Sequence, residues 1–271
     1  MNLLNSKSGL LGLVLVIFWF FIAVFGSLLA PYEVGVIVSY DVFEAMSGEY
    51  LLGTDYLGRD VLSRILHGAR LTIGLAFTAA LLAGAAGTIL GLLAAVSGGL
   101  FDQLLSRFMD ALISIPSKIF ALVMIAAFGS SFVLLLIITG VAYTPGCYRI
   151  ARALAVNLNE MDFVEVARAR GEGKLYLACI EIFPNMIHFM LTDFGLRFVY
   201  VVLMLSSLSF LGLGVQPPDA DLGSLVRENI SGLAEGATAV VMPAIAIATL
   251  TIGVNLLIDS LREKGFSVRG A

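Results

Sequence analysis

The sequence predicts an all-α, polytopic membrane protein with about six transmembrane helices. Of its 271 residues, 59% are hydrophobic and only 13% are charged, and the mean hydropathy is +0.98, a balance that excludes an ordinary soluble domain. The hydrophobic residues also fall into runs of about 20 residues, the length that an α-helix needs to cross a bilayer. The net charge of -4 and the lack of a Lys/Arg-rich tract give no indication of nucleic-acid binding.

Hydropathy places the spans at residues 9–30, 71–97, 108–128, 131–148, 191–213 and 238–260. We interpret the first run as an uncleaved helix, because Leu28 stands where a signal-peptide cleavage site would need a small residue. The third and fourth runs are hard to separate, since only the sequence Gly-Ser-Ser at 129–131 interrupts them. The chain therefore divides into a first helix with its outer loop, 1–70, and a core, 71–271.

The basic residues at the ends of the spans predict the orientation. One side receives most of them: Lys7, Arg107, Arg149, Arg152, Arg168, Arg170, Lys174, Arg262, Lys264 and Arg269. The other side receives Arg59, Arg64, Arg70 and Arg227. Because cytoplasmic loops carry the excess of Lys and Arg, we expect both termini and the polar interval 160–185 to be cytoplasmic.

Between the first two spans, the outer loop contains glycines at 53 and 58 that mark turns, and Asp60 is placed to cap a helix that starts at residue 61. In the second span, Gly87 and Gly91 have the small-x-x-x-small spacing that lets membrane helices approach closely, which favours packing within the chain. Lining of a substrate path is the alternative for this stripe.

Two pairs of charged residues near the membrane are spaced to neutralise each other. Arg107 and Asp110 lie at i, i+3, and Asp193 and Arg197 lie at i, i+4. Charged side chains at membrane depth are costly, so we expect each pair to face protein or water. A gating or coupling role is the alternative explanation.

The polar interval 160–185 has a helical periodicity of its own. Small and apolar residues recur at helical spacing before and after a break at residues 171–173: Val164, Ala167 and Gly171, then Leu175, Ala178 and Ile182. We therefore expect two short helices joined by a tight turn, the second closed by Pro184. The small residues at 167 and 171 would leave the backbone accessible to another protein. The alternative is a solvated surface helix with local charge pairs.

This interval resembles the cytoplasmic EAA loop of ATP-binding-cassette importer permeases, a pair of coupling helices marked by Glu-Ala-Ala, a Gly and a Pro. The matching residues here are Glu165, Ala167, Gly171 and Pro184, within a coupling loop of about 157–186. The resemblance implies that these four residues form the docking site for an ATPase subunit.

Two departures from the family pattern fall within this loop. Val166 replaces the second-position Ala, and Phe183 replaces the usual Leu before the Pro. Both are apolar residues of a different size or shape. We expect them to adjust the fit to this system's own ATPase.

Two further stretches resemble signatures of the dipeptide/oligopeptide/nickel type of permease. Residues 52–60 read Leu-Gly-Thr-Asp-Tyr-Leu-Gly-Arg-Asp, and residues 210–218 read Phe-Leu-Gly-Leu-Gly-Val-Gln-Pro-Pro. With the coupling loop between them, the resemblance covers nearly the whole chain. It implies a type I importer permease fold in a bacterial inner membrane and a cargo of peptides or a related small solute, such as nickel or a metal chelate.

The resemblance also implies partners: a second, related permease chain forming a heterodimer, two cytoplasmic ATPase subunits and an extracytoplasmic solute-binding protein. The chain itself contains no Gly-x-x-x-x-Gly-Lys-Ser/Thr loop to hold ATP phosphates. We therefore expect a non-catalytic permease without a cofactor, with ATP hydrolysed by partner subunits.

Alternative functions have less support in the sequence. A self-sufficient channel or ion-coupled carrier predicts internal repeats, broken helices near mid-membrane and ionisable residues deep in the spans. No clear repeat is found, and apart from Lys118 the ionisable residues cluster at the ends of the spans. A membrane enzyme would need a catalytic motif, and neither a nucleophile elbow nor His-Glu-x-x-His occurs. His67 and His188 are far apart, and Cys147 and Cys179 lack ligand spacing, so we expect no metal site and no disulfide. No residue identifies the substrate.

Overall fold

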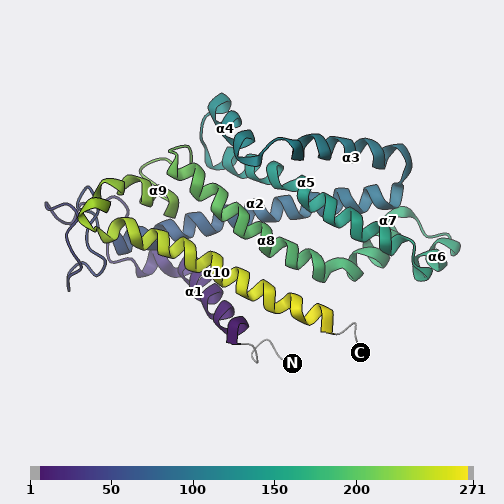
Figure 1. Cartoon of the computed structure of the whole chain (residues 1–271), viewed down its shortest axis with the longest axis horizontal. Helices are drawn as coiled ribbons and strands as arrows, with labels where there is room; N and C mark the ends of the chain where they lie inside the picture. The colour runs from purple at the N-terminus through teal and green to yellow at the C-terminus, as the bar shows by residue number, and fades with distance from the viewer. Residues whose placement is uncertain (1–6, 268–271) are drawn as a thin grey trace. The chain divides into compact units, whose positions relative to one another are not determined.

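The computed structural model describes residues 7–267, which are largely helical (Figure 1). Within that range there is no strand, only an isolated bridge between Thr54 and Asp60. Five helical segments are long and apolar enough to cross a membrane: α1 Lys7–Leu29, α2 Val61–Ser97, α5 Phe132–Asn159, the segment Lys174–Phe210 that ends in α8 Phe183–Phe210, and α10 Thr238–Ser267. The bent pair α3 Gly99–Ser114 and α4 Ser117–Phe128 supplies a sixth candidate span. This confirms the predicted all-α membrane fold.

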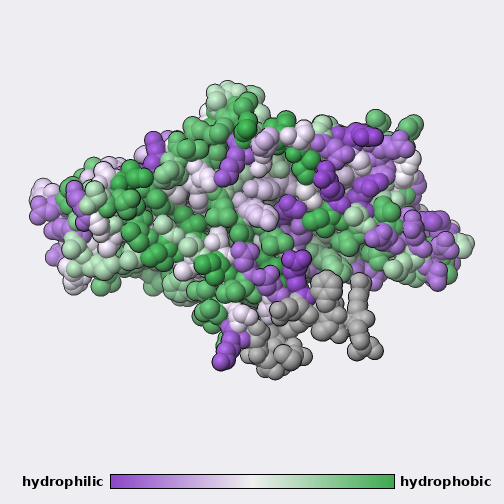
Figure 2. Space-filling view, viewed as in Figure 1, coloured by the Kyte–Doolittle hydropathy of each residue, from purple (hydrophilic) through white to green (hydrophobic). Residues whose placement is uncertain are grey.

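Hydrophobic side chains cover much of the face shown in Figure 2. In the most apolar 18-residue stretch of α1, only 28% of the residues are buried within the chain. In the corresponding stretch of α2, 50% of the residues are buried. A soluble protein could not leave so much apolar surface in water. These helices therefore have the surface expected of segments that contact lipid.

The chain forms two compact units. Unit 1 comprises Met1–Phe77, Ile125–Leu136 and Phe198–Ala271, and unit 2 comprises Thr78–Met124 and Ile137–Arg197. Arg269, one of the basic residues used to predict orientation, lies outside the described residues.

In unit 1, α1 and α10 pack closely because each presents a glycine to the other. A Cβ on Gly12 would lie 2.6 Å from the backbone nitrogen of Leu257, and a Cβ on Gly253 would lie 2.6 Å from the Cβ of Leu15. Trp19 adds a hydrogen bond of 3.1 Å from its indole Nε1 to the hydroxyl of Thr249. Close backbone contact and interhelical hydrogen bonds are the forces that hold helices together in lipid.

The outer loop of unit 1 is built around a buried carboxylate, Asp55, whose side chain is 1% exposed. It accepts hydrogen bonds from Arg59 at 2.8 Å and from Arg64 at 2.7 Å. Both arginines also contact Glu228, at 3.2 and 2.8 Å. The four side chains thus neutralise one another, two acidic and two basic, as buried charges require.

The turn and cap predictions for this loop are confirmed. Gly53 and Gly58 have φ values of +75° and +73°, and a Cβ on Gly58 would lie 2.1 Å from the carbonyl oxygen of Ser39. The carboxylate of Asp60 accepts a 2.8 Å hydrogen bond from the backbone nitrogen of Ser63, which caps α2. The predicted second span is therefore longer than expected, since α2 starts ten residues earlier, at Val61 rather than at 71.

The second outer signature has a structural role as well. α8 ends at Phe210, and the following chain leads to a short helix, α9 Leu222–Glu228, that Asp221 caps in a capping box with Ser224. Ser209 donates a hydrogen bond to the Asp221 carboxylate. Burial raises the pKa of Asp221, and the hydrogen bonds that it accepts oppose this effect. A Cβ on Gly214 would collide with Ser209, so only glycine fits there.

In unit 2, α2 and α5 touch backbone to backbone. A Cβ on Gly87 would lie 2.4 Å from the Cβ of Cys147 and 2.7 Å from the nitrogen of Tyr148, and a Cβ on Gly91 would lie 2.8 Å from the Cβ of Ala151. Core packing is thus the correct explanation for these two glycines. Cys147 is buried at this contact, whereas Cys179 is exposed.

The predicted span 108–128 is wrong as a single helix. It is the end of α3 and all of α4, which meet at an angle of 83°. Pro116 lies at the bend and holds Ile115 in an extended conformation, with φ -87° and ψ 121°. A helix cannot continue through a residue in that conformation.

α3 turns its polar side toward α5. Asp102 pairs with Arg152, the Ser106 hydroxyl hydrogen bonds to that of Tyr148 at 2.7 Å, and Asp110 pairs with Arg149 at 2.7 Å. The predicted partner of Asp110, Arg107, was wrong because the partner lies on a neighbouring helix. The pair of Asp193 and Arg197 within α8 is confirmed, at 3.2 Å.

We predict that Gly87→Ala lowers the free energy of unfolding by about 1–3 kcal/mol, because the added methyl group overlaps α5. Gly84→Ala, in the same helix, is the matched control. Its Cβ would meet only a ring atom of Phe194 at 3.8 Å, so its effect should stay within about 1 kcal/mol. Thermal unfolding of the purified protein in detergent measures both variants. Equal midpoints would contradict the close contact.

Candidate functional site

The candidate site is the segment 160–185 of unit 2, which starts with the short helix α6, Asp162–Ala169. α5 ends at Asn159, and Met161 is extended, with φ -84° and ψ 149°, which starts a new helix. Asp162 and Glu165 lie in the first turn and Arg168 lies in the last. This charge order favours the helix, because acidic groups stabilise its amino end and basic groups its carboxyl end.

One face of α6 is buried against the rest of unit 2. Val164 and Ala167 are 0% exposed and belong to one apolar cluster of α2, α5, α6, the segment that precedes α8 and the start of α8. The other fully or nearly buried members of this cluster are Leu92, Ala95, Ala151, Ala155, Leu177, Ala178, Ile182, Met186 and Met190. The cluster fixes α6 to the unit.

The prediction that Ala167 leaves the backbone accessible to another protein is therefore wrong. The residue is small because α6 packs closely on its own chain at that point. Among the four residues expected to form the docking site, Glu165, Gly171 and Pro184 are exposed. Ala167 can affect docking only by holding α6 in place.

The opposite face of α6 is exposed and mixes apolar with charged side chains. Val166 is 59% exposed, and Leu175, beyond the turn, is 69% exposed. Exposed Glu165, Arg168 and Arg170 lie in the same segment, which Figure 2 shows as a patch of hydrophilic residues where Figure 1 draws α6. We name the exposed residues Glu165, Val166, Arg168, Arg170, Gly171 and Leu175 the α6 surface. The α6 surface therefore offers both apolar and charged groups for contact with another protein.

Gly171 closes α6 in a Schellman motif. Its φ is +85°, its N–H donates to the carbonyl of Arg168 at 3.0 Å, and the N–H of Glu172 donates to the carbonyl of Ala167 at 3.3 Å. The glycine is needed for the left-handed backbone conformation, while a Cβ would meet no atom of the chain within 4 Å. The predicted tight turn is confirmed, and its outer side is open.

Pro184 does not close the second helix, so that prediction is wrong. The chain runs from α7, Lys174–Tyr176, through a π-helical segment, η2 Leu177–Ile182, into α8 without a break. The N–H of Phe183 bonds to the carbonyl of Ala178, five residues back. A helix with this wider spacing accommodates a proline at its second α-helical residue. Phe183 packs on the buried cluster, which does not fit the surface contact that we expected there, whereas Val166 is exposed.

Sequence reasoning missed two contacts in this segment. Arg170 lies 3.8 Å from Glu181, and the Lys174 ammonium donates to the carbonyl of Ser97, at the end of α2, at 3.4 Å. The spacing of 11 residues between Arg170 and Glu181 is not a helical pair spacing, so no periodicity indicates it. Only the turn at Gly171 brings these side chains together.

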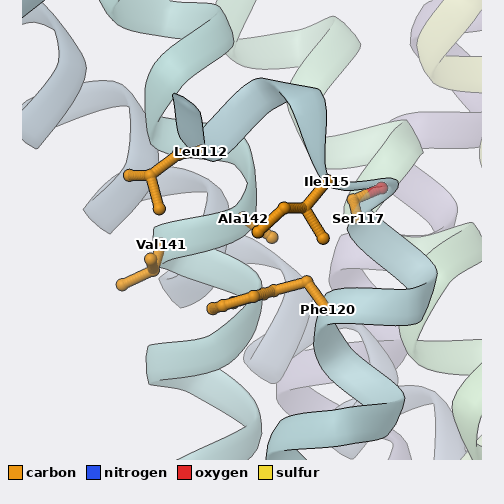
Figure 3. A pocket seen from close by; sticks show the side chains of 6 residues that line it. All are labelled: Leu112, Ile115, Ser117, Phe120, Val141 and Ala142. Atoms are coloured by element: carbon orange, nitrogen blue, oxygen red, sulfur yellow. The ribbon is translucent and has the colours of Figure 1, made fainter. Parts of the chain in front are cut away.

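A shallow hollow elsewhere in unit 2 lies inside the bend of α3 and α4 (Figure 3). It is lined by Leu112, Ile115, Ser117, Phe120, Val141 and Ala142. A single hydroxyl among apolar side chains offers no partner for a charged solute. We therefore assign no substrate site there. Within residues 7–267, no group of three or more His, Cys, Asp or Glu side chains is placed to hold a metal ion.

Comparison with known proteins gives a consistent result. Residues 87–264, more than half of the chain, match the family model of the binding-protein-dependent transport system inner membrane component. A provisionally named peptide transport system permease protein of Brucella suis is 36% identical over 97% of this chain and 88% of its own length. The dipeptide transport system permease protein of Haemophilus influenzae is 29% identical over 96% of this chain and 90% of its own length. The glutathione transport system permease protein of Escherichia coli is 32% identical, with 89% and 80% coverage.

We predict that Ala167→Leu lowers the free energy of unfolding by about 1–3 kcal/mol, because the buried cluster has no room for a larger side chain. Ala169→Leu in the same helix is the control. Ala169 is exposed, so its substitution should change stability by less than about 0.5 kcal/mol. Thermal unfolding in detergent checks both, and a destabilised Ala169→Leu with an unaffected Ala167→Leu would reverse our assignment of the two faces.

Proposed function

The chain belongs to the family of binding-protein-dependent transport system inner membrane components, and on that basis we propose that it carries peptides across the membrane, driven by ATPase subunits that dock on the α6 surface. It is a multi-pass inner-membrane permease component of an ABC transport system. Such components are non-catalytic, and the ATPase is a separate subunit.

The docking proposal rests on the difference between the two faces of α6. Its inner face is buried in the cluster of unit 2, and its outer face presents exposed apolar and charged side chains. Val166 on α6 and Leu175 beyond the turn at Gly171 are exposed apolar side chains that a partner subunit could cover. A helix that binds an ATPase subunit needs both an attachment to the permease and an exposed surface.

For this arrangement to work, the α6 surface must face the cytoplasm, where ATP is available. The bias of basic residues supports this orientation, in which both termini are cytoplasmic as well. ATP-driven closure of the two ATPase subunits would then move α6, and rigid-body movement of the helices would switch the permease from outward-facing to inward-facing. The matched residues 87–264 fall within 71–271, which we propose as the permease core.

Peptides are the cargo that the relatives favour, since the names of the three compared above refer to peptide, dipeptide and glutathione transport. Nickel or a metal chelate is the alternative of the same transporter type. We further propose a heterodimer with a second permease chain and delivery of the solute by an extracytoplasmic binding protein. A channel or ion-coupled carrier would need neither an ATPase nor a binding protein, so co-purification with an ATPase subunit discriminates between the two classes.

We predict that Gly171→Trp abolishes transport while Gly171→Asn retains most of it. Asn tolerates the left-handed conformation that this position requires, so it preserves the turn without adding bulk. A Cβ at this position would meet no atom of the chain within 4 Å, so a Trp side chain would not clash with the permease itself. It would instead occupy the surface on which we propose that the ATPase docks. Uptake, unfolding temperature and co-purification with the ATPase are measured for both. Full transport by Gly171→Trp would contradict docking at this turn.

We predict that cells lacking only this chain lose uptake of labelled di- and tripeptides and keep uptake of nickel ions. The complemented strain provides the reference. Loss of nickel uptake with normal peptide uptake would overturn the peptide assignment and leave the permease assignment in place.

A further inference from the structure

The π-helical segment η2, Leu177–Ile182, lies where α6 meets the long helix α8. A π-helical turn contains one residue more than the α-helix that would cover the same length, and its hydrogen bonds span five residues instead of four. Such turns are rare and are found most often at functional sites. Its wider spacing accommodates Pro184, and its position between α6 and α8 allows a further role.

The backbone around η2 is held by an irregular set of hydrogen bonds. The Phe183 N–H donates to the carbonyl of Ala178, Pro184 has no N–H to donate, and the side chain of Asn185 donates to the carbonyl of Glu181 at 2.7 Å. The regular i to i-4 ladder is therefore interrupted between the docking region and the span. Bending at such an interruption costs less than bending an intact α-helix.

α6 is attached directly to this interrupted segment. The elements pack on each other, and the buried face of α6 shares one apolar cluster with Leu177, Ala178 and Ile182. The pair of Arg170 and Glu181 joins the end of α6 to η2 on the exposed side. A displacement of α6 would therefore act on η2, as well as on α5, which α6 follows in the chain.

The part of α8 beyond η2 is held more firmly. The Asp193–Arg197 pair is largely buried, with side chains 7% and 15% exposed, and the Arg197 guanidinium lies against Gly146 of α5, where a Cβ would come within 2.6 Å of it. This anchor makes the middle of α8 move with α5. η2 lies between α6, which an ATPase would displace, and this anchored part of α8, and its interrupted hydrogen bonding lets the chain bend there.

We propose that η2 is a hinge that transmits the movement of α6 to the transmembrane part of α8, by changing its π-helical hydrogen bonding during the transport cycle. This inference rests on the proposed function, since it requires that an ATPase moves α6. It concerns the transmission step alone. Docking depends on the exposed face of α6, and transmission depends on the extra residue of η2.

The test is deletion of Cys179, an exposed residue of η2, with Cys179→Ala as the matched control. Deletion allows η2 to become α-helical while the residues on either side keep their faces. We expect the variant to co-purify with its ATPase subunits and to hydrolyse ATP in proteoliposomes, with peptide transport per ATP reduced about tenfold relative to Cys179→Ala. Transport per ATP equal to that of the control would overturn the hinge.

A second measurement does not depend on the folding of a variant. Hydrogen exchange of the wild-type complex is compared without nucleotide and with ATP trapped. We expect the exchange rates of amides 177–183 to differ between the two states, and those of residues 190–200 to stay the same. Equal rates at 177–183 in a complex that contains ATPase subunits would overturn the hinge alone. Failure of the wild-type chain to co-purify with any ATPase would overturn the proposed function, and the hinge with it.

Discussion

The contact between α2 and α5 at Gly87 and Gly91 supports most of unit 2. In a membrane the hydrophobic effect does not drive helices together, because lipid is as apolar as the side chains. Association then depends on van der Waals contact and hydrogen bonds over a short distance, which large side chains would prevent. Further along the same two helices, α6 packs on an apolar surface formed by Leu92, Ala95, Ala151 and Ala155. The close contact between the backbones of α2 and α5 therefore positions the residues on which α6 packs.

In unit 1, polar groups organise the loop between α1 and α2, beside the close contact of α1 and α10. Asp55, Arg59, Arg64 and Glu228 join a loop, the start of α2 and the end of α9 through charges that are largely removed from water. Removal of one partner from such a cluster typically costs about 3–5 kcal/mol, because the remaining charges stay buried and uncompensated. The two outer sequence signatures are therefore explained by folding. Their Gly, Asp and Arg residues form turns, caps and ion pairs, and no substrate contact is needed to account for them.

The sequence was sufficient for the presence of the long apolar helices other than 108–128, the Asp60 cap, the turn at Gly171 and the Asp193–Arg197 pair, because each depends on composition or on local spacing. The predictions from the sequence were wrong at two prolines, and the two errors were of opposite kinds. Pro116 ends a helix that hydropathy showed as continuous, and Pro184 lies within a helix that we expected it to end. A proline ends a helix or not according to whether the surrounding backbone can rearrange its hydrogen bonds, and near Pro184 the π-helical spacing and Asn185 allow it. The buried face of α6 was also missed, since a small residue fits an exposed surface and a close contact equally well.

The Schellman motif at Gly171 has an evolutionary consequence. Its two hydrogen bonds occupy the carbonyls of Ala167 and Arg168, so a protein that binds the end of α6 recognises side chains more than backbone. Folding constrains Val164, Ala167 and Gly171, whereas the exposed side chain of Val166 is not buried in the cluster. Selection can therefore alter recognition without disturbing the fold. After gene duplication, paralogous importers could come to bind different ATPase subunits through substitutions at a few exposed positions. Each of these substitutions would leave the permease stably folded.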